Sequence, residues 1–134
     1  MSIRKMIALH PDVHGHVNQP LGDAAHHLMY CARMCLSCAD ACAAEKMDMT
    51  QCIRLCLDCA DTCDATLRVL SRQTEFVATA ARAQVAACRE LCAICALECE
   101  RHAEHHEHCR ICGEVCRRCE QACSAVLDAM GEPS

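Results

Sequence analysis

The chain has 134 residues, a formal net charge of -5 at pH 7, and 17 cysteines. Tryptophan is absent, and the single tyrosine, single phenylalanine, four glycines and three prolines leave little material for sheets and turns. This composition excludes an all-β sandwich, a collagen-like chain and a disordered chain. An acidic excess without a Lys/Arg-rich stretch or stacking aromatics also argues against nucleic acid as a partner.

The beginning of the chain is too poor in apolar residues for a secretory signal peptide. Only Met6 to Leu9 stand between Lys5 and His10, and no stretch approaches the ~18 uncharged apolar residues of a membrane span. We therefore expect a cytoplasmic protein with no membrane partner, whose cysteines are kept as thiols. Complete internal pairing is impossible in any case, because the number of cysteines is odd.

The first 22 residues contain two prolines and two glycines and predict an extended or partly helical leader. Residues 23–131 form the second region, which is dominated by good helix formers. Proline-free helices are predicted over 24–47, 50–71, 75–103 and 105–130. The short connections favour antiparallel neighbours, so the predicted fold is all-α, an up-down-up-down four-helix bundle with a short N-terminal leader.

The cysteines repeat with one spacing, C-x3-C-x2-C-x3-C, once in each predicted helix. The four sets are Cys31, Cys35, Cys38, Cys42; Cys52, Cys56, Cys59, Cys63; Cys88, Cys92, Cys95, Cys99; and Cys112, Cys116, Cys119, Cys123. Cys109 extends the fourth set by one step of three residues. At about 100° per residue, such a set stays within a stripe about 60° wide on one helix face. All four cysteine seams are therefore expected to face the bundle axis.

Two structural explanations of these seams fail. Cysteine fills less volume than the Leu, Ile or Val that a bundle core needs, and each void costs about 1 kcal/mol or more. Disulfides are opposed by a reducing compartment and by the geometry of cysteines three or four apart on one helix. The remaining explanation is metal, because thiolate is the soft ligand of Cu(I), Zn(II) and iron-sulfur clusters.

Charge balance favours copper among these metals. Many buried thiolates need nearly full neutralisation, and Cu(I) achieves it with about one bridging ion per thiolate. Zinc would need about one ion per two thiolates in closed tetrahedra and remains an alternative. An iron-sulfur, ferredoxin-like protein is a second alternative, although the loop spacing of such sites is absent. A thiol oxidoreductase is suggested only by local C-x-x-C pairs, which here lie in mid-helix.

With its four cysteine sets, the chain resembles the bacterial copper storage proteins, specifically their cytosolic branch. The resemblance extends from about residue 24 to residue 130. It implies a homotetramer of four-helix bundles whose interior cysteines hold many Cu(I) ions. Cys109, the odd cysteine, is a point at which the chain departs from the family pattern, and we expect it to be a metal ligand as well. It also implies storage without catalysis, so no enzymatic activity is expected. A copper chaperone or a small thiol is the expected donor of the ions.

Several histidines and a methionine continue the seams toward one end of the bundle. His105 and His108 precede Cys112 by seven and four residues, His102 follows Cys99, and Met49 precedes Cys52. Imidazole and thioether bind Cu(I) more weakly than bridging thiolate and could pass ions inward. The sequence therefore predicts the entrance for copper at this end, with His102, His105, His108 and Met49 as ligands. His106 is predicted to face aside from the seam.

The opposite end is predicted to be closed by apolar side chains, namely Leu70, Phe76, Val77, Leu127 and Met130. His27, four residues before Cys31, lies on the seam there. Apolar residues turned away from the axis, namely Leu36, Leu57, Ile94 and Leu97, suggest contacts between protomers.

Overall fold

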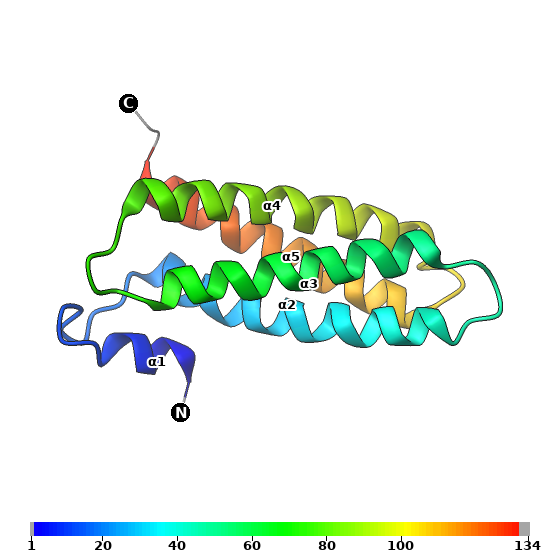
Figure 1. Ribbon diagram of the computed structural model, residues 1–134, viewed down its shortest axis with the longest axis horizontal. Helices are drawn as coiled ribbons and strands as arrows, with labels where there is room; N and C mark the ends of the chain where they lie inside the picture. The colour runs from blue at the N-terminus through cyan, green and yellow to red at the C-terminus, as the bar shows by residue number, and fades with distance from the viewer. Residues whose placement is uncertain (1, 132–134) are drawn as a thin grey trace.

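The computed structural model describes residues 2–131 and contains five helices. These are α1 (Ile3–Ala8), α2 (Gln19–Ala43), α3 (Thr50–Ser71), α4 (Ala78–Arg101) and α5 (Glu107–Met130). The four long helices run side by side along one axis, and α1 lies outside them near one end (Figure 1). The predicted all-α four-helix bundle is thereby confirmed.

The connections sort the bundle into two ends. The α2–α3 and α4–α5 connections meet at one end, while the α3–α4 connection, α1 and the start of α2 lie at the other (Figure 1). We call the first the histidine end, because it holds His102, His105, His106 and His108, and the second the apolar end. This arrangement matches the one expected from short antiparallel links.

Helix boundaries differ from the expectation where local chemistry sets them. Helix α2 begins at Gln19 because the Asn18 side chain accepts a hydrogen bond from the backbone N–H of Leu21, capping the helix. Helix α4 begins at Ala78, later than expected, after Glu75 adopts a left-handed backbone with φ of 54°. Helix α5 begins at Glu107, so His105, which was predicted to be the first residue of this helix, lies outside it.

The leader contains a short helix that is fastened to the bundle. Ile7 of α1 is buried, and Arg4 forms an ion pair with Asp23 and donates a hydrogen bond to Gln19 at 3.0 Å. His10 Nε2 lies 2.9 Å from the hydroxyl of Thr74 in the α3–α4 connection. The leader thus covers part of the apolar end.

Sulfur and small side chains fill the middle of the bundle, and larger apolar groups fill the apolar end. Leu28, Leu70, Val85 and Val126 are buried there, and Phe76, Leu127 and Met130 pack against them. Val77 was expected in this plug but is 58% exposed, because it is the residue that caps α4 in an extended conformation. Among residues 2–131, no helix combines the length and apolar character needed to cross a bilayer.

Candidate metal centre

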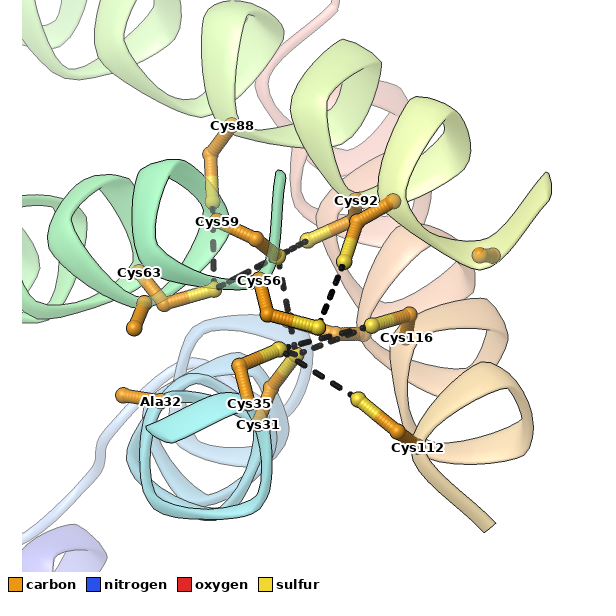
Figure 2. Packing of buried hydrophobic residues seen from close by; sticks show 14 of the residues in the cluster. Cys31, Ala32, Cys35, Cys56, Cys59, Cys63, Cys88, Cys92, Cys112 and Cys116 are labelled. Carbon is orange, nitrogen blue, oxygen red and sulfur yellow. Dashed lines mark hydrogen bonds between the residues drawn. The ribbon is translucent and has the colours of Figure 1, made fainter. Parts of the chain in front are cut away.

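All 17 cysteines, which lie between residues 31 and 123, are buried free thiols. Side chains from α2, α3, α4 and α5 point toward a common centre, whereas Ala32 points away from it (Figure 2). Neighbouring Sγ atoms of different helices approach closely, as between Cys35 and Cys116 at 3.6 Å and between Cys31 and Cys59 at 4.0 Å. The helical phase of the seams therefore brings the thiols together as the spacing predicts.

Four groups of four cysteines have all their Sγ atoms within 4.8 Å of one another. They are Cys31, Cys59, Cys63, Cys92; Cys31, Cys35, Cys59, Cys116; Cys38, Cys52, Cys56, Cys99; and Cys38, Cys42, Cys52, Cys109. Cys31 and Cys59 belong to two groups, and so do Cys38 and Cys52. Shared members therefore join the first group to the second and the third to the fourth, which gives two joined pairs of groups along the axis.

The separations between sulfurs suit soft metal ions. With a metal–sulfur bond of about 2.3 Å, thiolates around a tetrahedral or trigonal ion lie roughly 3.8 to 4.0 Å apart. The Cys63–Cys92 and Cys38–Cys42 pairs, at 3.7 and 3.9 Å, match this range. Such separations are far longer than a disulfide bond of about 2.05 Å. The thiols are thus placed to share ions between them.

Burial keeps the outermost thiols, Cys42 and Cys109, protonated when no cation is near. Burial, followed by the charge of Cys52, raises the pKa of Cys42 from its ordinary value of 9.0 to about 11. The pKa of Cys109 is raised for the same reasons, with Cys42 as a further contributor. Each arriving cation must therefore displace protons, and its binding weakens as the pH falls.

The same pKa shift makes the stability of the reduced, metal-free protein depend on pH. Folding raises the pKa of Cys42, so the protonated thiol contributes to the free energy of unfolding. This contribution is fully present below the unfolded pKa of about 9 and is lost as the pH rises toward about 11. We expect the melting temperature to fall by roughly 10 °C between about pH 8 and about pH 10.5. Anaerobic circular dichroism melts measure this fall. The variant Cys42→Ala should show a smaller one, and a constant melting temperature would contradict the pKa shift.

A cluster of polar side chains joins the α2–α3 connection to the start of α5 at the histidine end. The carboxylate of Glu45 accepts a hydrogen bond from His108 Nε2 at 2.9 Å, and His106 Nδ1 lies 3.1 Å from the same carboxylate oxygen. The two imidazole rings stack with their centroids 5.5 Å apart. Hydrogen bonding to His108 lowers the pKa of Glu45, so this residue is ionised at neutral pH.

Glu45 determines which ring nitrogens face possible ligand partners. A carboxylate only accepts, so His108 Nε2 carries the proton and Nδ1 of the neutral ring keeps its lone pair. That Nδ1 lies 3.5 Å from Cys38 Sγ and 3.6 Å from Cys109 Sγ. His106 Nε2 lies 3.0 Å from Met47 Sδ, a thioether that can only accept a hydrogen bond. Soft donors thus lie at two depths. His106 and Met47 are at the surface, and His108 is beside the outermost thiols.

Of the residues predicted to line the entrance, some are buried or half-buried and one is exposed. Met49 is 3% exposed in the core, and His102 is half-buried, with Nε2 2.9 Å from the buried carboxylate of Glu98. His105, predicted to continue the α5 seam, is instead exposed in the turn before that helix. His106 was predicted to face aside, yet it belongs to the cluster. Helical phase does not apply to it, because it precedes α5 with an extended backbone.

The fold and the sulfur-lined axis together define a metal-binding helical bundle of the soft-ligand type. A family model described as copper storage protein matches residues 17–128. The chain therefore belongs to the copper storage protein family, which confirms the resemblance drawn from the cysteine spacing. No curated protein matches the chain.

Solved structures of a protein from Streptomyces lividans are similar over most of the chain. The copper storage protein Ccsp loaded with 10 copper equivalents is 44% identical, with a TM-score of 0.90, and the match covers 95% of this chain and 98% of that one. A cytosolic copper storage protein with five coppers is 48% identical, with a TM-score of 0.81 over 82% and 93% of the two chains. A histidine-to-alanine variant of Ccsp is 47% identical, with a TM-score of 0.83 over 84% and 96%.

Proposed function

We propose that this protein stores Cu(I) ions along the bundle axis. The observation that carries the proposal is the set of four-cysteine groups that share members. Sharing suits ions that are bridged by thiolates, each sulfur serving two ions, and Cu(I) binds thiolates in this way. Anaerobic titration of the reduced protein with Cu(I) against a competing chelator tests it. Saturation below about four ions would contradict storage.

Zinc and iron-sulfur chemistry fit the same thiols less well. A closed zinc tetrahedron needs four thiolates of its own, whereas Cys31, Cys38, Cys52 and Cys59 each belong to two groups. Zinc would neutralise the same thiolates with about half as many ions, held in separate sites instead of along a continuous axis. Family membership and neighbours solved with copper also favour copper over both alternatives.

Copper uptake is proposed to begin at the histidine end. His106 with Met47 forms an outer pair of soft donors, and His108 Nδ1 faces the thiols of Cys38 and Cys109. An ion released by a copper chaperone or a small thiol would exchange its ligands stepwise from nitrogen to sulfur. His102 and Met49 are further ligands of this path, and His105 is left out because it lies in the turn before α5 and not on the cysteine seam of that helix.

The variant His108→Ala is expected to slow copper uptake about ten-fold while changing the saturating load by at most about one ion, since it removes one donor of the transfer step. Stopped-flow absorbance at the thiolate-to-copper charge-transfer band measures the rate. The matched control is His105→Ala, three residues away and exposed, which should behave like the unmodified protein. Equal rates for both variants would contradict the proposed path.

The storage function also bears on the oligomeric state, the cellular location and the absence of catalysis. Leu36, Leu57, Ile94 and Leu97 are 36 to 52% exposed on the outside of the bundle, where they would be covered in a homotetramer. We propose a cytoplasmic location, like that of the Streptomyces lividans protein described as cytosolic. We also propose that the protein has no catalytic role, because thiols saturated by bridging ions hold their cargo without an open coordination position.

A further inference from the structure

A surface hollow between α2 and α5 reaches the sulfur-lined axis from the side. It has a volume of about 210 Å³ and is lined by Met34, Ser37 and Cys38 of α2 and by His108, Ile111 and Cys112 of α5. Larger hollows lie elsewhere, for example over Thr50 to Asp58 on the outer face of α3, and that one includes no cysteine. The α2/α5 hollow therefore opens a path through the wall of the bundle to two seam thiols.

The wall is thin here because of the residues at its surface. Ser37 is exposed and small, and 2% of the surface of the neighbouring Cys38 remains accessible, the largest fraction among the 17 cysteines. Cys112 on the other side retains 1%, as do Cys42, Cys52 and Cys59 outside the hollow, whereas Cys35 and Cys99 retain none. Helices α2 and α5 are joined by no direct connection, so their contact depends on side chains alone.

The groups in the hollow are those that a cuprous ion needs. Met34 lies one helical turn before Cys38 on the same face, so its thioether stands on the way to that thiol. Cys38 belongs to two of the four-cysteine groups. Cys112 Sγ lies 3.8 Å from Cys35 Sγ and leads further inward. A soft donor at the surface thus stands before thiols that are already connected to the centre.

We propose that the α2/α5 hollow is a second, lateral uptake site for Cu(I), which receives the ion from a complex with small thiols. The ion binds the Met34 thioether and then the Sγ atoms of Cys38 and Cys112. Binding to Met34 breaks one copper bond to a donor thiolate and forms one to the thioether, which has no proton to give, so the donor leaves as a thiolate. At Cys38 and Cys112 the copper bonds to Met34 and to the second donor thiolate break as bonds to Sγ form, each protein thiol passes its proton to a released thiolate, and copper stays monovalent. This proposal rests on the storage function and adds to it a path through the side of the bundle, which meets the path from the histidine end at His108 and Cys38 and bypasses His102 and His106.

Pulsed alkylation of the reduced, metal-free protein with iodoacetamide, followed by peptide mass spectrometry, tests access to the hollow. Cys99 is an internal control, because it is fully buried but close to Cys112. Its Cβ lies 3.5 Å from the position that a Cβ on Gly113, the residue after Cys112, would occupy. We expect Cys112 to react at least about five times faster than Cys99, since thiol reactivity depends on access. In Ser37→Leu, which fills the hollow, the two rates should become similar. In Ile111→Ala, which widens it, the ratio should rise.

Copper transfer tests use of the hollow. With Cu(I)–glutathione as donor, Ser37→Leu should lower the initial uptake rate about three- to five-fold with an unchanged saturating load. Met34→Leu, which keeps the volume and removes the sulfur, should lower the rate about two-fold. Equal labelling of Cys112 and Cys99, or an unchanged rate in Ser37→Leu, would overturn the lateral site. A load below about four ions in the unmodified protein would overturn storage itself, so the two failures are distinguishable.

Discussion

Replacing Cys38, Cys52, Cys56 and Cys99 together by alanine is expected to remove about four copper ions from the saturating load, because Cu(I) neutralises buried thiolates about one to one. These four thiols form one group on the axis near the histidine end, and two of them, Cys38 and Cys52, are shared with the group that contains Cys42 and Cys109. The thiols deeper in the bundle, such as Cys63, Cys88 and Cys92, keep their partners. Anaerobic titration with a competing Cu(I) chelator, with metal and protein quantified in the saturated complex, measures the loss.

The control variants keep all the cysteines and change small buried residues beside the seams. Ala39 and Ala96 are buried next to cysteines but belong to no four-cysteine group. Ala39→Ser and Ala96→Ser should cost stability, at about 1 to 3 kcal/mol for an unpaired hydroxyl, and should leave the load unchanged. A quadruple cysteine variant that still binds the full load would show that this group does not hold copper.

The second expected result is a large gain in stability on loading. A core in which cysteine replaces Leu and Ile packs less apolar volume, so the reduced, metal-free bundle should melt at a modest temperature. Each ion that binds only the folded protein adds about 4 kcal/mol when its concentration is about 1,000 times its dissociation constant. Several such ions should raise the melting temperature by more than about 20 °C. Differential scanning calorimetry at stepwise copper loads measures this.

The dependence on load separates specific binding from adventitious binding. The melting temperature should rise with each added equivalent until saturation and then stay constant. In the quadruple cysteine variant the curve should level off about four equivalents earlier. A melting temperature that does not change with load would mean that copper also binds the unfolded thiols as strongly as the folded bundle.

The surface donors at the histidine end could not be located from the spacing of residues. His105 has the right distance from Cys112 for the α5 seam, but the helix begins only at Glu107, so that distance has no geometric meaning. His106 lies beside Met47 and Glu45 because two connections, far apart in the sequence, meet at this end (Figure 1). The lone pair that His108 Nδ1 turns toward Cys38 likewise depends on Glu45, a residue of another element.

The cysteine seams, in contrast, were determined by the sequence itself. Steps of four, three and four residues keep Cys31 to Cys42 on one face of any α-helix, because about 100° per residue is a local property of the backbone. Four helices that each carry such a seam and are joined by short connections favour one arrangement, the antiparallel bundle with its sulfurs inside. Only the tertiary structure decided which thiols share a group, which histidines reach them, and where the wall between α2 and α5 is thin. Those features arise from contacts between elements whose relative rotation and height no local periodicity specifies.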